Sequence, residues 1–532
     1  MNNPDIYDFI IIGSGFGGSV AAMRLSEKGY SVLLLEKGKR FDAKDFPKSD
    51  WNLNKYLWLP QLGWKGILQL KFSRNMFVLS GTGVGGGSLV YANALMEPDR
   101  SIFSDKSWIH YGDWKSKLEK HYAAAKKILG AVPYTDLHTE DRELLKVARE
   151  LGREDTFSPV DVGIFLGDEK IETDPYFKGL GPIRKGCSRC AGCMTGCKEN
   201  AKNTLDKNYL FFAEKNGTQI VPDIKVNKIE HNDEYYTVTA RKSNNLRSMQ
   251  FRSSRLVVSA GVLGTMELLL KQKFKYNSLP LLSALLGTNI RTNSQSISGI
   301  VKSSLKLNNG PAITSIFSPR PDTHVELVKF NDRSGAVTHL SGFACEGKSP
   351  FRRFLNQIRK TILHPFKFIS LLFYPRWCQN SIVLLVMQTK DSAIQMKWKY
   401  NLFGGRISLG NQHRKTPVFI PEGQDVLYRL AKNTHATPMN SIAETLGNMS
   451  TTAHIIGGNP MGNSSDEGVV DEEFQVHNYP GMYILDGSVI PCNLGVNPSL
   501  TIAAISEYAC SLIPEKPGNS IKPLEWQLAR LP

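Results

Sequence analysis

Two apolar runs near the start of the chain predict the first elements of the fold. Residues 9–12 (Phe-Ile-Ile-Ile) form a continuous apolar run, which is typical of a strand buried on both faces of a parallel sheet. An alanine-rich stretch follows, and a second apolar run then ends at Glu36 in "SVLLLE". A strand, a helix and a second strand in this order predict a βαβ unit of the α/β class.

Three glycines separate the first apolar run from the predicted helix. Gly13, Gly15 and Gly18 form a G-x-G-x-x-G motif. The first allows a tight turn, the second lets the backbone approach a pyrophosphate, and the third lets the helix pack closely on the strand. Glu36, at the end of the second strand, is placed to accept hydrogen bonds from a ribose hydroxyl. The motif predicts a site for NAD or FAD and disfavours NADP.

Length and N-terminal composition indicate the general class of protein. A chain of 532 residues with 41% hydrophobic and 21% charged residues is expected to form about two globular domains. The first residues lack the basic region of a signal peptide and lead directly into the first predicted strand. We therefore expect a cytoplasmic protein with reduced thiols.

The net charge of +16 is unevenly distributed. Between Glu346 and Asp391 there is no acidic residue, whereas eight residues are basic: Lys348, Arg352, Arg353, Arg359, Lys360, Lys367, Arg376 and Lys390. The segment 347–380 is also rich in Leu, Ile and Phe, but prolines and a lysine interrupt it too often for a membrane-spanning helix. Two interpretations stay open: a surface that lies peripherally on the anionic inner face of a membrane, or a packed helix pair with a solvated basic face. Nucleic-acid binding is disfavoured because no known nucleic-acid module accompanies the charge.

A second glycine cluster resembles a known flavin signature. "FVLSGTGVGGGSLVYANALMEP" places Gly83 and Gly86 among five glycines, followed by Ser88 and Asn93. This loop resembles the second flavin signature of the glucose–methanol–choline (GMC) oxidoreductases, and "GVGGGSLV" resembles their cholesterol oxidase-like branch. The C-terminal stretches "TTAHIIGGNPMG" and "GMYILDGSVIPCNLGVNPSLTI" occur in the order of that family.

The resemblance implies the cofactor, the fold and the cofactor-binding residues. FAD is the expected cofactor, and the expected fold is a Rossmann-type FAD-binding domain interleaved with a β-sheet substrate-binding domain. The FAD-binding domain is predicted over 1–40, 74–125, 200–290 and 450–515. The substrate-binding domain is predicted over 41–73, 126–199 and 291–449, and includes the cysteine-rich loop 186–198. Further cofactor contacts carry over to Val226, Ala260, Asp486 and Gly487.

The resemblance also implies a catalytic group. Oxidation of an alcohol sends a hydride to flavin N5 and a proton to a base; a histidine suits the proton because its ordinary pKa is near neutrality. His454 matches the family's base, and Asn497 matches the asparagine that cholesterol oxidases pair with it. Those enzymes use a glutamate to move a double bond, for which Glu346 is the candidate; a solvated loop glutamate is the alternative.

The expected substrate is a hydrophobic alcohol, either a sterol or another lipid-like alcohol, and the electron acceptor is oxygen or another compound. The runner-up hypothesis is a long-chain or terpenoid alcohol dehydrogenase that passes electrons through an iron–sulfur cluster. A membrane-associated redox carrier is a third hypothesis, which the presence of both His454 and Asn497 disfavours.

Four cysteines form a compact run. Cys187, Cys190, Cys193 and Cys197 have the spacing C-x2-C-x2-C-x3-C, which bacterial ferredoxins use for iron–sulfur clusters. Lys198 follows the last cysteine, where a ferredoxin run has proline. An iron–sulfur cluster, a zinc ion bound by four thiolates and a turn of reduced thiols all stay open.

Overall fold

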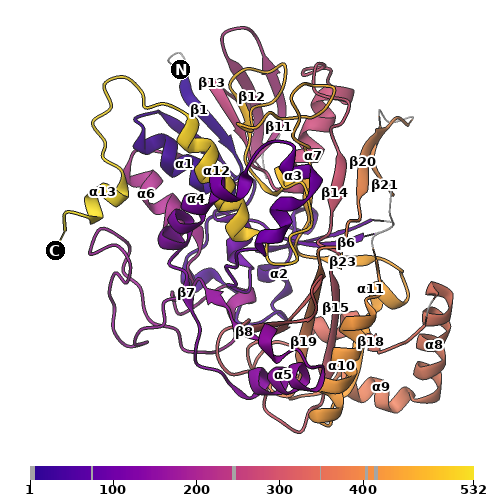
Figure 1. Cartoon of the computed structure of the whole chain (residues 1–532). Helices are drawn as coiled ribbons and strands as arrows, with labels where there is room; N and C mark the ends of the chain where they lie inside the picture. The colour runs from indigo at the N-terminus through magenta and orange to yellow at the C-terminus, as the bar shows by residue number, and fades with distance from the viewer. Residues whose placement is uncertain are drawn as a thin grey trace.

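Two large β-sheets organise the chain (Figure 1). The computed structural model describes residues 6–73, 76–242, 247–347, 349–401, 405–411 and 417–531. Within these ranges each large sheet has seven strands, and two smaller sheets of four and three strands connect them. The mixture of parallel strands, helices and a second sheet confirms the predicted α/β fold class. The predicted domain boundaries stay a prediction.

The first sheet contains the predicted βαβ unit. Its strand order is β10-β2-β1-β13-β12-β11, with β25 also paired to β13. The strands are β1 (Tyr7–Ile12), β2 (Val32–Leu35), β10 (Gln219–Val221), β11 (Ile224–His231), β12 (Tyr236–Lys242), β13 (Ser248–Val258) and β25 (Met482–Ile484). β1 pairs in parallel with both β2 and β13, as the continuous apolar runs predict.

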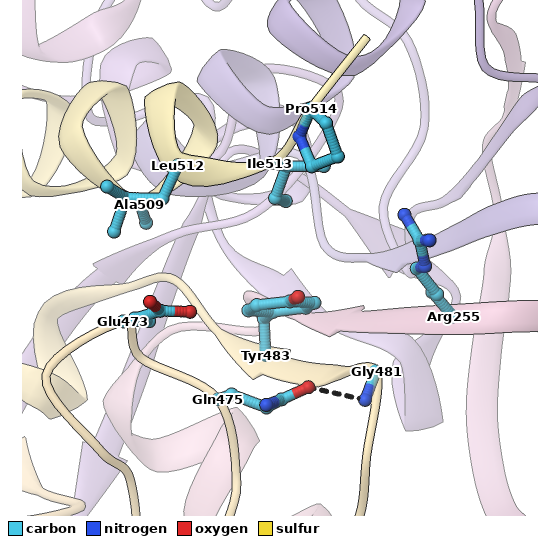
Figure 2. A pocket seen from close by; sticks show the side chains of 9 residues that line it. All are labelled: Arg255, Glu473, Gln475, Gly481, Tyr483, Ala509, Leu512, Ile513 and Pro514. Carbon is cyan, nitrogen blue, oxygen red and sulfur yellow. Dashed lines mark hydrogen bonds between the residues drawn. The ribbon is translucent and has the colours of Figure 1, made fainter. Parts of the chain in front are cut away.

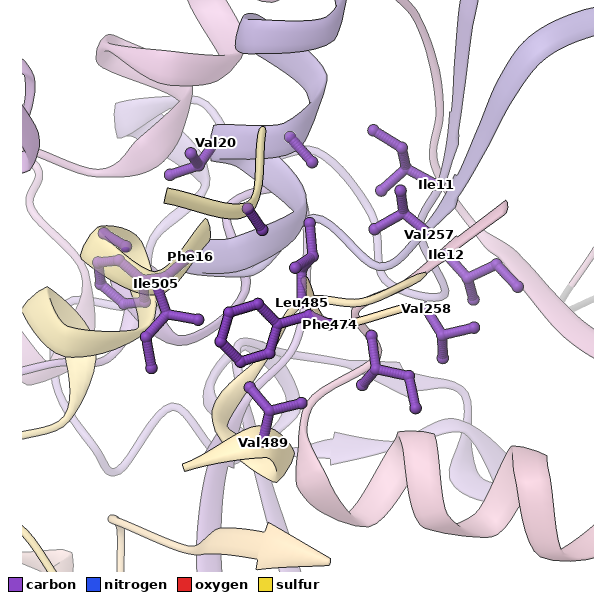
Figure 3. Packing of buried hydrophobic residues seen from close by; sticks show 14 of the residues in the cluster. Ile11, Ile12, Phe16, Val20, Val257, Val258, Phe474, Leu485, Val489 and Ile505 are labelled. Atoms are coloured by element: carbon purple, nitrogen blue, oxygen red, sulfur yellow. The ribbon is translucent and has the colours of Figure 1, made fainter. Parts of the chain in front are cut away.

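Helices from both ends of the chain cover this sheet. α1 (Phe16–Glu27) packs between α12 (Ser499–Leu512) and α6 (Tyr209–Lys215), and α12 also packs on α4 (Trp114–Leu129). Figure 3 shows Val20 and Phe16 of α1 together with Ile505 of α12, Leu485 and strand residue Val257. Each such buried side chain contributes about 1.5–3 kcal/mol relative to exposure to water. The core therefore joins the first and last hundred residues.

The second sheet is antiparallel, with the strand order β18-β22-β15-β19-β17-β16-β8. The strands are β8 (Ser158–Pro159), β15 (Ser296–Val301), β16 (Ser315–Arg320), β17 (Thr323–Val328), β18 (Ser341–Phe343), β19 (Ile382–Gln388) and β22 (Thr437–Ser441). α5 (Thr139–Glu150) and α10 (Pro421–Asn433) pack against it and share an apolar cluster with its strands. A second sheet was expected from the family resemblance, and its role in substrate binding stays a prediction.

Two small sheets lie between the large ones. The first contains β5 (Leu68–Phe72), β6 (Met76–Gly81) and β23 (Ser450–Thr452), and the second contains β14 (Thr288–Arg291), β20 (Ile394–Lys399), β21 (Arg406–Asn411) and β24 (Ile456–Gly458). β23 pairs in parallel with β6, which ends at the second glycine cluster. Shorter elements are α2 (Leu53–Tyr56), α3 (Lys106–Ile109), α7 (Val262–Leu270), α11 (Ile442–Thr445), α13 (Leu524–Leu528), β3 (Trp58–Leu59), β4 (Trp64–Lys65), β7 (Val132–Pro133) and β9 (Asp161–Val162).

The basic apolar segment folds as a helix pair. α8 (Pro350–Leu363) and α9 (Pro365–Leu372) each begin with a proline. Proline fits the first helical position because a backbone N–H at that position would have no partner within the helix. Ser349 caps α8 by accepting a hydrogen bond from the backbone N–H of Arg352. Lys348, part of the predicted basic segment, lies outside the described residues. Across the ranges given above, no helix is both long enough and apolar enough to cross a membrane.

Candidate active site

The two glycine clusters meet at the carboxyl end of β1. A Cβ atom on Gly86 would lie 2.7 Å from the Cα of Gly15, so only glycine allows this approach. The hydroxyl of Ser14 lies 3.2 Å from the carbonyl oxygen of Gly83 and accepts a hydrogen bond from the N–H of Gly85 at 3.1 Å. Glu36 accepts hydrogen bonds from the N–H and the hydroxyl of Ser14 at 3.1 and 2.9 Å. Hydrogen bonds thus connect the predicted pyrophosphate loop, the second glycine cluster and Glu36, the residue predicted to bind the ribose.

Space and polar groups around these residues fit a dinucleotide such as FAD. A Cβ atom added to Gly15 would meet no atom within 4 Å, although the surrounding residues are largely buried. Asn93 is fully buried, and among the residues that the structure describes neither its amide nitrogen nor its amide oxygen has a partner. Buried polar groups normally form hydrogen bonds, so the buried amide of Asn93 fits a group that hydrogen-bonds a cofactor. Gly15 would approach the pyrophosphate, and Asn93 would supply hydrogen bonds to the bound cofactor.

Replacing Gly15 with valine should abolish flavin binding without unfolding the protein. Its φ of −69° is open to any residue, and the new side chain would fill the empty space in front of the loop. We expect purified Gly15→Val to lack flavin absorbance but to keep the circular-dichroism spectrum of the flavin-free parent.

Gly18→Val provides the contrasting control for this experiment. A Cβ on Gly18 would lie 2.0 Å from the carbonyl oxygen of Gly13, so this change should reduce folding itself. Flavin bound to Gly15→Val at the parental ratio would contradict the placement of the pyrophosphate.

The other predicted cofactor residues lie around the same strands, and their contacts with FAD stay a prediction. Val226 lies buried on β11, and Ala260 follows β13. Asp486 accepts hydrogen bonds from the N–H of Ser488 at 2.8 Å and the hydroxyl of Thr265 at 2.6 Å, with burial raising its pKa. Gly487 begins the short turn that follows it.

The hydroxyl group of Ser88, which was predicted to contact the cofactor, forms hydrogen bonds within the protein. Its hydroxyl donates to the carbonyl oxygen of Gly85 at 2.7 Å and accepts from the N–H of Leu205 at 3.1 Å. The side chain is completely buried. Ser88 therefore joins the second glycine cluster to the segment that follows the cysteine run.

His454 is positioned by the strand that precedes it. β23 pairs with β6 through Thr452 and Val78, which brings the chain beside the second glycine cluster. The backbone N–H of His454 donates to the hydroxyl of Thr452 at 2.9 Å, and that hydroxyl lies 2.9 Å from the carbonyl oxygen of Thr292. Gln295 accepts a hydrogen bond from the N–H of Ala453 at 3.2 Å. Hydrogen bonds to Thr452 and Gln295 thus fix the loop that carries the histidine.

Asn497 joins His454 to a carboxyl group. The amide nitrogen of Asn497 lies 3.4 Å from His454 Nε2 and 3.4 Å from Glu326 Oε2. His454 Nδ1, the amide oxygen of Asn497 and Glu326 Oε1 all lack partners in the described structure. Donation from the amide leaves Nε2 as the unprotonated nitrogen of the ring. The arrangement places an imidazole, an amide and a carboxyl group within reach of one substrate.

Burial shifts the pKa values of both His454 and Glu326. It lowers the pKa of His454 to about 4, because the imidazolium would lose its hydration. It raises the pKa of Glu326, which is completely buried, to about 8. At pH 7 the imidazole is therefore neutral and able to accept a proton, whereas the Glu326 carboxyl holds one.

Glu326, and not Glu346, is the carboxyl group beside Asn497. Glu346 is exposed; its backbone carbonyl oxygen accepts a hydrogen bond from Asn356 and its side chain lies near Tyr428. Glu326 is therefore better placed than Glu346 to act with Asn497, and the identity of a second base stays a prediction. An acidic residue inside the apolar strand "THVELV" was the available signal, since Glu326 lies in the interior of β17.

Asn293 is a second residue that sequence reasoning missed. Its amide nitrogen donates to the carbonyl oxygen of Val496 at 2.8 Å, and its amide oxygen accepts from the N–H of Gly495 at 2.9 Å. It adopts a left-handed backbone conformation with φ of 58°. Asn293 thus holds the turn that carries Asn497.

The four cysteines do not form a metal-ligand group in the described structure. Cys193 is buried, Cys190 is exposed, and Cys187 and Cys197 are half-buried. Three of their sulfur atoms accept backbone N–H groups: Cys187 from Arg189, Cys193 from Ala312 and Cys197 from Ala201. Burial raises the pKa of Cys187 to about 12 and that of Cys193 to about 11.

Lys202 connects the cysteine run to the second glycine cluster. Its ammonium group donates to the carbonyl oxygen of Leu89 at 3.0 Å and to that of Cys193 at 2.7 Å. Because it is completely buried, its pKa falls to about 7. The cysteine run is thereby fixed against the cofactor loop.

A hollow of about 280 Å³ at the edge of the first sheet contains none of the predicted site residues (Figure 2). Arg255 and Tyr483 come from its strands, and Ile513 and Pro514 follow α12. The oxygen of the Gln475 side chain accepts a hydrogen bond from the N–H of Gly481. We assign no function to this hollow.

Comparison with known proteins identifies the family. Models of GMC oxidoreductases match residues 183–291 and 409–506, and an NAD(P)-binding Rossmann-like model matches residues 11–50. A cholesterol oxidase of Acinetobacter baumannii is 40% identical to this chain and covers 97% of it and 96% of its own length. A cholesterol oxidase of Mycobacterium tuberculosis (strain CDC 1551 / Oshkosh) is 41% identical, with 98% of this chain and 93% of that protein covered.

A solved structure gives the same fold at low sequence identity. Pyridoxine 4-oxidase from Mesorbium loti superposes with a TM-score of 0.61 at 14% identity, over 95% of this chain and 98% of its own. The near full-length identity of 40% and the matched family models agree with the two glycine clusters and the C-terminal motifs. This chain therefore belongs to the GMC oxidoreductase family, in its cholesterol oxidase-like branch.

Proposed function

We propose that this protein oxidises the hydroxyl group of a sterol-like alcohol with FAD as its cofactor. The observation that carries the proposal is the contact of Asn497 with both His454 and Glu326. Asn497 and Glu326 are buried, His454 is partly buried, and the strand before His454 pairs with β6, which leads to the second glycine cluster. The similarity to cholesterol oxidases supports a bulky hydrophobic alcohol. In the proposed function, oxygen accepts the electrons.

Each residue has a distinct task in the proposed reaction. His454 Nε2 takes the proton of the substrate hydroxyl, because the neutral imidazole is the available form at pH 7. Asn497 lies between His454 and Glu326, and its amide group holds the substrate oxygen close to His454 Nε2. Bound FAD would supply the acceptor for the hydride that leaves the carbinol carbon. Glu326 is placed to move a proton on the product and so to shift a double bond.

Among the alcohols compared, a sterol should reduce the flavin of the purified protein most rapidly. Under anaerobic conditions, loss of flavin absorbance is measured with cholesterol, a long-chain primary alcohol and a terpenoid alcohol, all in the same detergent. We expect cholesterol to give the highest reduction rate, and oxygen to restore the flavin absorbance in every case. Faster reduction by the long-chain or terpenoid alcohol would contradict the sterol assignment and favour the runner-up hypothesis from the sequence.

An iron–sulfur cluster at Cys187, Cys190, Cys193 and Cys197 stays a prediction of the ferredoxin-like spacing. In the same preparation, stoichiometric iron and broad absorbance beneath the flavin bands would support it. Iron-free protein with full oxygen-dependent turnover would support a structural turn of thiols. The absence of a metal-ligand group among the described residues favours the structural turn.

We also propose that any membrane contact is peripheral and occurs through the helix pair α8 and α9. The inner face of a cytoplasmic membrane is the surface that matches the basic charge of the segment 347–380. Such contact would bring a water-insoluble alcohol close to the enzyme.

A further inference from the structure

α8 and α9 expose an unusually large set of apolar side chains. Phe366, Ile362 and Phe351 are 87%, 71% and 68% exposed. We define the α8–α9 apolar face as the nine exposed residues Phe351, Phe354, Leu355, Ile358, Ile362, Leu363, Phe366, Ile369 and Phe373. In Figure 1 the two helices lie at the edge of the molecule, away from β1 and α1. A contiguous exposed apolar surface of this kind is typical of an interaction site.

The orientation of the helix pair is fixed from its inner side. Arg353 is buried and donates to the side-chain oxygen of Asn448 at 3.1 Å and to the carbonyl oxygen of Gly347 at 3.2 Å. Lys360 donates to the carbonyl oxygen of Ala344 at 2.6 Å, and Leu371 is buried. The apolar face is therefore presented outward by specific contacts.

The charge around this face selects the kind of partner. Arg352, Arg359, Lys367 and Arg376 are exposed, and in the part of the chain that the structure describes they form no ion pair. No acidic residue occurs from 347 to 390. A second copy of this face would bring like charges together, whereas an anionic surface would neutralise them. Apolar side chains bordered by unpaired cations fit the interface of an anionic bilayer.

Aromatic contacts extend the surface beyond the two helices. The ring of Phe373 lies 5.3 Å from that of His339, which lies 5.3 Å from the ring of Trp51, measured between ring centres. Trp51 is 52% exposed. Tryptophan is favoured at the level of lipid headgroups because its ring combines an apolar body with a polar N–H.

We infer that the α8–α9 apolar face is a docking surface for an anionic lipid bilayer, into which Phe351, Ile362 and Phe366 insert. The Arg353–Asn448 hydrogen bond places the inner side of this surface on the chain segment that leads through β23 to His454. The inference deepens the proposed function, on which it rests for the identity of the lipid-soluble substrate. Docking would bring the base of the active site close to the bilayer that holds the alcohol.

Vesicle binding tests the inference without any substrate. The full-length protein is sedimented with phosphatidylcholine vesicles that contain either no phosphatidylglycerol or a large fraction of it, at low and high salt. We expect binding to the anionic vesicles, weakened by salt because the exposed charges are screened. The triple variant Phe351→Ser, Ile362→Ser, Phe366→Ser should bind at least tenfold more weakly. The variant Arg352→Gln, Arg359→Gln, Lys367→Gln should lose the preference for anionic vesicles.

Ile171→Ser, Ile183→Ser, Leu281→Ser is the matched control, because these residues are similarly exposed but lie outside α8 and α9. It should bind vesicles as the parent does. Equal binding by the parent and the apolar triple variant would overturn the inference, and so would no binding by the parent. A parental dimer that the apolar triple variant converts to a monomer, without vesicle binding, would assign the face to self-association and also overturn it.

Turnover of detergent-solubilised alcohol separates this inference from the proposed function. The apolar triple variant should keep parental activity in detergent and lose activity only on alcohol held in vesicles. An inactive parent in detergent with intact vesicle binding would contradict the proposed alcohol oxidation and leave the docking surface supported.

Discussion

Replacing His454 with alanine should slow flavin reduction by the alcohol about 10²–10⁴-fold while FAD stays bound, the range expected for loss of a general base. The effect is large because His454 Nε2 is the unprotonated nitrogen beside Asn497, and Glu326 is protonated at pH 7. No other described group in this cluster is a neutral base at that pH. Rapid mixing under anaerobic conditions measures the rate directly from the flavin absorbance.

The pH dependence of the parent provides an independent check. Burial lowers the pKa of His454 to about 4, so the imidazole is neutral above that value and becomes protonated below it. The reduction rate should therefore stay level from about pH 5.5 to 7 and fall as the pH drops through 4. Asn497→Ala should also slow reduction without releasing flavin. An unchanged rate in His454→Ala would contradict its role as base.

Glu326→Gln should suppress the shift of a double bond in a sterol product at least about 10²-fold, at the lower end of the effect of a lost acid–base group. Oxidation of the hydroxyl should continue, because His454 is unchanged. Gln has nearly the same shape and can still accept the hydrogen bond from Asn497, but its amide cannot carry the proton. The test measures the conjugated ketone and the unconjugated ketone separately after a single turnover.

The pH profile and a matched variant distinguish the two glutamates. The carboxylate of Glu326 forms as the pH rises through about 8, so the double-bond shift in the parent should accelerate up to that pH. Glu346→Gln should behave as the parent in both steps, because Glu346 is exposed and lies near Tyr428. Loss of the shift in Glu346→Gln, with normal behaviour of Glu326→Gln, would reverse the assignment.

Local sequence patterns were sufficient to predict the first strand, the glycine turn and the first helix. The apolar run and the glycines after it depend on neighbouring residues, so β1, the turn and α1 follow where the pattern predicts them. His454 and Asn497 were found through a family resemblance, and the structure brings the two together. The polarity of the chain alone would not have separated His454 from the other ten histidines.

The arrangement of residues around the proposed substrate site depends on pairings between strands that are far apart in the sequence. Glu326 faces Asn497 only because β17 pairs with β19 in the second sheet, and Asn293 meets Val496 across two hundred residues of sequence. The rotation of α8 likewise follows from the contacts of Arg353 with Asn448 and Gly347. These pairings arise from tertiary packing, which no local pattern encodes. For the same reason the sequence offered Glu346 as the candidate carboxyl group, whereas the structure has Glu326 beside Asn497.

The parallel pairing of β23 with β6 has a consequence for biosynthesis. β6 leaves the ribosome early, but its partner, residues 450–452, follows only after most of the chain has been made. β25 and α12, which complete the first sheet and cover α1, emerge later still. Non-local pairings of this kind form slowly, and until they form the face of α1 that packs on α12 has no cover. The nascent chain should therefore depend on chaperones, and it should acquire a complete cofactor site only near the end of its translation.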